Sequence, residues 1–131
     1  MTRKHQLDGL KQLSGLQFRA AQAEMAELLR RESALRQNLE QLIQSKSRQA
    51  QASRQSDEAA LIAGADIRWH QWVDQRRATI NTELAQILAL KENCRVKLKR
   101  AFGRDQVTQT LHDQTVQSQK RALQRKQDYE S

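Results

Sequence analysis

Residues 69–101, WHQWVDQRRATINTELAQILALKENCRVKLKRA, decide the fold of this chain. Apolar side chains recur here at steps of three, four and seven residues, at Trp69, Val73, Ile80, Leu84, Ile87, Cys94, Leu98 and Ala101. Such steps place the side chains along one narrow stripe of an α-helix, which is the pattern of a coiled-coil seam. The stretch therefore predicts a long helix that buries this stripe against a second helix.

A matching stripe lies toward the N-terminus. Its seven-residue series and the adjacent core series consist of Leu7, Ser14, Phe18, Ala21, Met25, Leu28, Leu35, Leu39 and Leu42. Lys11 and Glu32 interrupt the stripe, and Glu32 is expected to form a surface ion pair with Arg36 one helical turn away. The sequence thus predicts two helices with complementary stripes.

The pattern fails between the two stripes, where a polar stretch at 47–58 precedes Gly64 and Asp66. Gly64 can adopt a left-handed conformation, and Asp66 can cap the helix that follows. We therefore expect an all-α fold, a long antiparallel two-helix coiled-coil hairpin. The chain would form a single coiled-coil domain over residues 1–131, with helices at about 3–57 and 66–128 and a turn at about 58–65. Two extended chains paired side by side would bury the same stripes, and that alternative stays open.

The turn position also predicts which residues face each other. With a turn centred near residue 61, positions whose numbers add to about 123 lie opposite, since both helices rise equally per residue. Leu42 is then expected to meet Ile80 and Leu84, Leu28 to meet Cys94, and Phe18 to meet Phe102.

The composition argues against an enzyme. Apolar residues make up 37% of the chain and aromatic residues 4%, while 29% are charged, and proline is absent. This supplies a narrow seam but no round core, and a two-helix rod offers no enclosed pocket. No Gly-rich phosphate loop and no set of metal ligands occurs, so we expect no catalytic residue, cofactor or metal, and we expect the three histidines to be solvated on the surface.

Charge and cysteine usage indicate the setting in which the chain works. No apolar run approaches the roughly 18 residues of a membrane span, and the start of the chain lacks the pattern of a secretory signal, so we expect no direct membrane insertion. The lone Cys94 favours a cytoplasmic location. The formal net charge of +8 favours an acidic partner without choosing one.

Three surface features are candidates for partner contact. Arg3 and Lys4 would meet Lys120, Arg121, Arg125 and Lys126 in a basic tip at the chain ends. A second basic cluster, from Arg95 to Arg104, fits a solvated face, an acidic protein partner or nucleic acid, and its role is left open. Trp72 lies off the stripe and is expected either to pack or to anchor a partner.

The stretch LDGLKQLSGLQFRAAQAEMAELLR at 7–30, the polar end of the first helix and the opening Ile67-Arg68-Trp69 together resemble the FliJ/YscO family of type III export stalk proteins. The resemblance covers most of the chain. It implies a coiled-coil hairpin whose terminal end enters a hexameric export ATPase and whose surface nearer the loop contacts the export gate, a membrane protein. It also implies a cytoplasmic location, peripheral to the inner membrane through these partners, with export chaperones as further partners and no nucleic acid.

Carried over to this chain, the resemblance places ATPase contacts at Arg3, Lys4, Leu7, Leu10, Lys120, Arg121, Leu123, Arg125 and Lys126. It places export-gate contacts at Leu42, Lys46, Gln49, Trp72 and Gln75. Whether the system would be flagellar or a virulence apparatus stays open. The alternatives to an export stalk are a generic coiled-coil adaptor or chaperone that binds helical partners and a basic nucleic-acid-binding rod.

Overall fold

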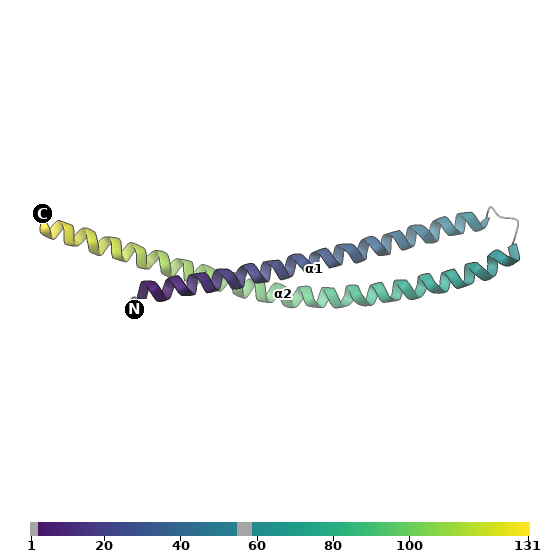
Figure 1. Cartoon of the computed structure of the whole chain (residues 1–131), viewed down its shortest axis with the longest axis horizontal. Coiled ribbons are helices and arrows are strands. Elements are labelled where there is room, and N and C mark those ends of the chain that lie inside the picture. The colour runs from purple at the N-terminus through teal and green to yellow at the C-terminus, as the bar shows by residue number, and fades with distance from the viewer. Residues whose placement is uncertain (1–2, 55–58) are drawn as a thin grey trace. The chain divides into compact units, whose positions relative to one another are not determined.

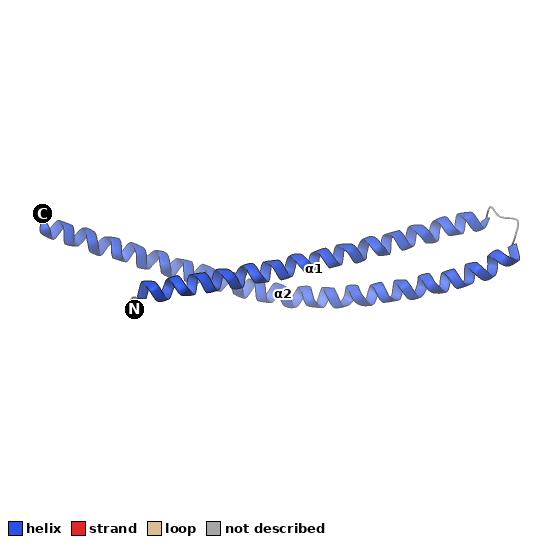
Figure 2. Cartoon of the chain, in the orientation of Figure 1, coloured by secondary structure: helices blue, strands red, loops and turns tan. Residues whose placement is uncertain are grey.

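Two long helices account for nearly all of the described chain. The computed structural model describes residues 3–54 and 59–131, including their side chains except those of residues 53 and 59–63. Helix α1 runs from Arg3 to Arg54 over 52 residues, and α2 runs from Ala59 to Glu130 over 72 residues (Figure 1). No strand occurs within the described ranges (Figure 2). The all-α prediction is confirmed.

The chain divides into two compact units, each built from one stretch of either helix. Unit 1 comprises Met1–Met25 and Asn93–Ser131, and unit 2 comprises Ala26–Glu92. In unit 1, Asp8 lies against His112 near one end and Glu24 lies near Lys97 at the other. Positions therefore rise along α1 as they fall along α2, which is the antiparallel arrangement expected of a hairpin.

Unit 2 has an apolar seam. Leu42 from α1 packs with Val73, Ile80 and Leu84 from α2, and Ile80 is only 1% exposed. Half-buried Trp69 lies against this cluster. The expected contact of Leu42 with Ile80 and Leu84 is confirmed, and the stripe that begins at Trp69 does form the seam.

Unit 1 has a seam of smaller residues. Ala21, Cys94 and Ala101 are buried, and the Cys94 Sγ lies 3.7 Å from the carbonyl oxygen of Ala21. The rings of Phe18 and Phe102 pack with centroids 5.5 Å apart and planes tilted by 50°, a geometry that aromatic pairs favour. The predicted contact between these two rings is confirmed.

The start of the second helix differs from the prediction. Helix α2 begins at Ala59, so Gly64 and Asp66 lie inside it, and Gly64 has no positive φ. Asp66 therefore caps nothing and instead approaches His70 at 3.3 Å within the helix. The alanines and leucine at 59–63 are strong helix formers, and one interior glycine costs only about 1 kcal/mol, too little to end a growing helix. The predicted helix end at 55–57 and the first turn residue, 58, lie outside the described residues.

Candidate partner-binding surfaces

The end of α2 extends past the first residues of α1 within unit 1 (Figure 1). Arg3, the first described residue of α1, lines a groove with Leu111, Ser118 and Ala122 of α2. Every residue from 117 to 131 is exposed, and Leu123 is 61% exposed. This end of α2 consequently offers all of its faces to a partner.

The predicted ATPase-contact residues gather around this end. All six cations of the predicted basic tip are exposed, and none forms an ion pair within the described ranges: Arg3, Lys4, Lys120, Arg121, Arg125 and Lys126. Leu10 is 53% exposed, whereas Leu7 is half-buried at the seam. The structure thus brings together a basic, partly apolar surface carried mainly by α2.

The predicted export-gate group is only partly a surface. Leu42 is buried in the core of unit 2, so its side chain cannot also meet a partner, and its assignment to a contact surface is wrong. Its place in the seven-residue series already puts it on the stripe that faces α2. Lys46 and Gln49 are half-buried, and Gln75 is exposed.

Trp72 is the exposed aromatic of this group. Its side chain is 56% exposed and lines a shallow groove with Ser45 and Arg76. A large aromatic held at the rim of a groove is a favoured anchor for a partner because it loses little conformational freedom on binding. Of the five predicted gate-contact residues, Trp72 therefore has the best geometry for that role.

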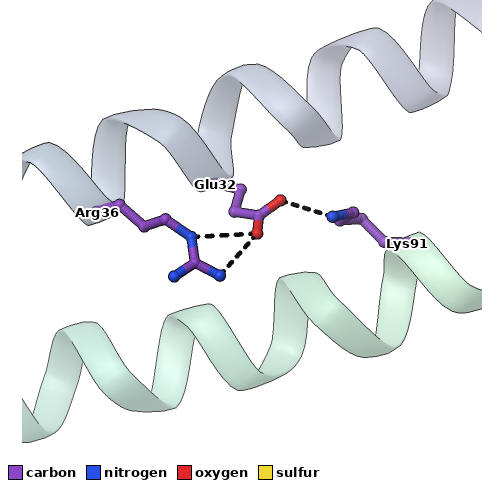
Figure 3. Close-up of polar contacts among 3 residues, drawn as sticks. All are labelled: Glu32, Arg36 and Lys91. Atoms are coloured by element: carbon purple, nitrogen blue, oxygen red, sulfur yellow. Dashed lines mark hydrogen bonds and ion pairs between the residues drawn. The ribbon is translucent and has the colours of Figure 1, made fainter.

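A buried carboxylate lies in the seam of unit 2 (Figure 3). The Glu32 side chain is 12% exposed; its Oε2 accepts a hydrogen bond from Lys91 Nζ at 2.7 Å, and its Oε1 accepts one from Arg36 Nη2 at 2.9 Å. These two bonds, Lys91 first, hold the pKa of Glu32 below its ordinary value. The expected pair with Arg36 does form, with the Arg36 side chain 60% exposed and only Glu32 buried at the seam. The register that places residue 91 opposite residue 32 could have revealed Lys91.

Unit 1 carries polar contacts across its seam. His112 Nε2 lies 2.7 Å from Asp8 Oδ1, and the Ser14 hydroxyl donates to Asp105 Oδ1 at 3.1 Å. The His112 side chain is 19% exposed, so the expectation of a solvated histidine is wrong at this position. Ser14 is a small residue in the seven-residue series, and it leaves room for this hydrogen bond between the helices.

Two kinds of site are absent from the described residues, a metal-binding cluster and a membrane-spanning segment. No group of three or more His, Cys, Asp or Glu side chains there could hold a metal ion. Neither helix, over its described part, has a segment long and apolar enough to cross a bilayer.

Comparison of the chain with known protein families, curated proteins and solved structures gives no match.

Proposed function

We propose that this chain is a non-enzymatic stalk of a type III protein export apparatus. Its terminal end, in unit 1, contacts a hexameric export ATPase, and the surface around Trp72, in unit 2, contacts the export gate. Any ATP hydrolysis belongs to the ring, and the chain couples the ring mechanically to export.

The exposed end of α2 carries this proposal. Lys120, Arg121, Arg125 and Lys126 form no ion pair with any described residue, and Leu123 lies exposed between them. A single helix with cations around an apolar residue fits an acidic opening better than a flat surface, because every face of the helix can make contact.

The resemblance to export stalk proteins is the reason for proposing a hexameric export ATPase as the partner of this surface. The exposed Trp72 gives a second, separate contact surface, as a component with two partners requires. With Leu42 buried, the gate contact rests on Trp72 and its neighbour Gln75.

The test is ATP turnover by a hexameric export ATPase at physiological salt, with and without the full chain. The first variant replaces the four α2 cations by glutamine, at Lys120, Arg121, Arg125 and Lys126. The matched control removes four exposed cations elsewhere, at Arg48, Arg54, Arg68 and Arg77. Both variants lower the net charge equally, so only the position of the lost charges differs.

We expect the full chain to stimulate turnover with saturation near one chain per ring. The control should keep this stimulation, and the α2 variant and a chain lacking 120–131 should lose it. The proposal fails if the full chain neither stimulates nor co-sediments with the ring, or if both charge variants lose stimulation equally.

A coiled-coil adaptor for helical partners is the second candidate. It is favoured by Leu10, Leu13 and Leu16 on α1, which are 53%, 53% and 58% exposed. An adaptor that binds along its length would tolerate loss of 120–131, whereas the stalk would not.

A further inference from the structure

A groove runs beside the seam of unit 1. It is lined by Gln17, Ala20 and Glu24 from α1 and by Lys97, Arg100 and Arg104 from α2. Ala21 and Ala101 also line it, and because their side chains are short the two helices leave a shallow trough there. The α2 residues follow steps of three and four, so one wall of the groove is a row of three cations.

The same rows continue toward the chain ends with apolar residues. Steps of three and four from the groove lead to Leu13 and Leu10 on α1 and to Val107 and Leu111 on α2. Leu13 is 53% exposed, Val107 60% and Leu111 46%. Since such steps keep side chains on one helix face, these residues extend the groove, and Leu111 in turn lines the next trough beside Arg3.

We call the whole feature the lateral groove: Leu10, Leu13, Gln17, Ala20 and Glu24 on α1, and Lys97, Arg100, Arg104, Val107 and Leu111 on α2. It has a basic part and an apolar part. The opposite side of unit 1 differs, because the groove there is lined by Asp8, Asp105 and His112, which already bond to residues of the facing helix. The lateral side carries exposed apolar side chains instead, at Leu13, Val107 and Leu111.

The cations of the lateral groove are available to a partner. Arg100 and Arg104 are exposed and pair with no carboxylate in the described part of the chain, and Lys97 only approaches Glu24 at 3.9 Å. Arg95 and Lys99, the other cations of this cluster, do not line the groove. The basic cluster from Arg95 to Arg104 is continuous in the sequence, but only three of its cations, Lys97, Arg100 and Arg104, line the groove.

We propose that the lateral groove binds an amphipathic helix with an apolar stripe and acidic residues toward one end. A trough between two packed helices accepts side chains at steps of three and four, which only a third helix supplies along its whole length. Leu13 and Val107 would contact its apolar stripe. Arg100 and Arg104 would meet its carboxylates.

Charge decides among possible occupants. A second copy would bring the same cations and a net charge of +8 against this face, which disfavours self-association. Nucleic acid would use the cations but leave Leu13 and Val107 uncovered. The groove shares Leu10 with the proposed ATPase contacts but none of the cations 120–126 of the α2 end, so deletion of 120–131 separates this inference from the export proposal.

The probe is a fluorescent helical peptide of about 21 residues, three heptads with Leu at both core positions and Glu at the flanking ones. Its twin carries Lys in place of Glu. Anisotropy titrations use the full chain at physiological salt. The acidic peptide should bind at least about tenfold more tightly than the twin, as complementary charges at a partly apolar site allow.

Two double variants test the groove. Leu13→Gln with Val107→Gln removes the apolar contact, and Arg100→Glu with Arg104→Glu reverses the charge. Each should weaken the acidic peptide by about tenfold or more, and the charge-reversed chain should gain affinity for the Lys twin. All four residues are exposed, and circular dichroism verifies that helicity is kept.

The controls change exposed residues off the groove, with Leu16→Gln for the apolar variant and Arg19→Glu with Lys99→Glu for the charge variant. These should leave binding unchanged, and so should deletion of 120–131. Equal losses in control and groove variants would overturn the proposal. Self-association through this face, or binding of duplex DNA that depends on Arg100 and Arg104 while the acidic peptide does not bind, would overturn it as well.

Discussion

Lys91 Nζ of α2 lies 2.7 Å from Glu32 Oε2 of α1 in a seam that is otherwise lined by apolar side chains (Figure 3). Arg36 occupies the other carboxylate oxygen, so Glu32 is satisfied only when residue 91 lies opposite residue 32. If the helices slipped by one heptad, Glu32 would lose Lys91 and keep only Arg36 of its own helix, which is unfavourable for a carboxylate at the seam. The pair therefore selects one register for unit 2.

The first prediction concerns the loss of this pair. Glu32→Gln should lower the melting temperature because it leaves Lys91, whose side chain is only 27% exposed, without its counter-charge. Glu27→Gln is the control, since Glu27 pairs with Arg30 on the exposed surface at 2.6 Å. Thermal melts followed by circular dichroism should show the larger drop for Glu32→Gln. Equal drops would mean that Glu32 is no more important than a surface pair.

The pH dependence follows from the same carboxylate. The pKa of Glu32 is lowered in the folded chain, so the unfolded state binds more protons as the pH falls through the acidic range. The stability that Glu32 contributes is present above the ordinary glutamate pKa of about 4.3 and is lost as the pH falls through the lower, folded value. The difference in melting temperature between wild type and Glu32→Gln should be full at neutral pH and shrink below that range. A constant difference would contradict this origin.

Much of the fold could be predicted because the heptad stripe is a local signal. Leu42, Ile80 and Leu84 lie on the two apolar stripes, and the structure buries all three in the seam between the helices. The position of the turn could not be predicted in the same way. Gly64 is compatible with both a left-handed turn and a helix interior, and the choice depends on the cooperative growth of α2 from Ala59.

The candidate surfaces were predictable only in part, for a different reason. The basic end of α2 could be predicted because a run of Lys and Arg can be recognised in the sequence without knowing which residues it contacts. The family resemblance assigned Leu42 to a contact surface. A resemblance indicates which positions correspond but not whether their side chains are buried, and Leu42 is buried. The contact of Asp8 with His112 depends on which side of each helix faces the other, and spacing along a single helix does not contain that information.

A third prediction distinguishes a helical Gly64 from a turn. In α2 a Cβ at this position would meet nothing within 4 Å, so Gly64→Ala should raise the free energy of unfolding by about 0.5–1 kcal/mol through helix propensity. Gly103→Ala, also helical and open, should give a similar gain and serves as the reference. Chemical denaturation measures both. Destabilisation by Gly64→Ala alone would indicate a left-handed conformation at that residue.

The fourth prediction uses the thiol of Cys94 as a probe of seam opening. Its side chain is 1% exposed, and burial raises its pKa, so both access and thiolate content are low. Labelling by a disulfide reagent at neutral pH should be on the order of a hundredfold slower in the folded chain than in denaturant. A control with Cys94→Ala and a cysteine in place of exposed Ala89 should label at similar rates in both states. Fast labelling of native Cys94 would show that the seam of unit 1 opens readily.

The unequal lengths of α1 and α2 have a consequence for how the end of α2 meets any partner. Beyond the residues that face Arg3, this end has no neighbouring helix among the described residues, so its shape depends on a helix–coil equilibrium that propagates from the packed part of α2. Asp128 and Glu130 oppose the helix dipole at this terminus, which favours fraying from Glu130 inward. A partner that binds the helical form must also order it, and its affinity will therefore increase on cooling and with any change that extends the helix.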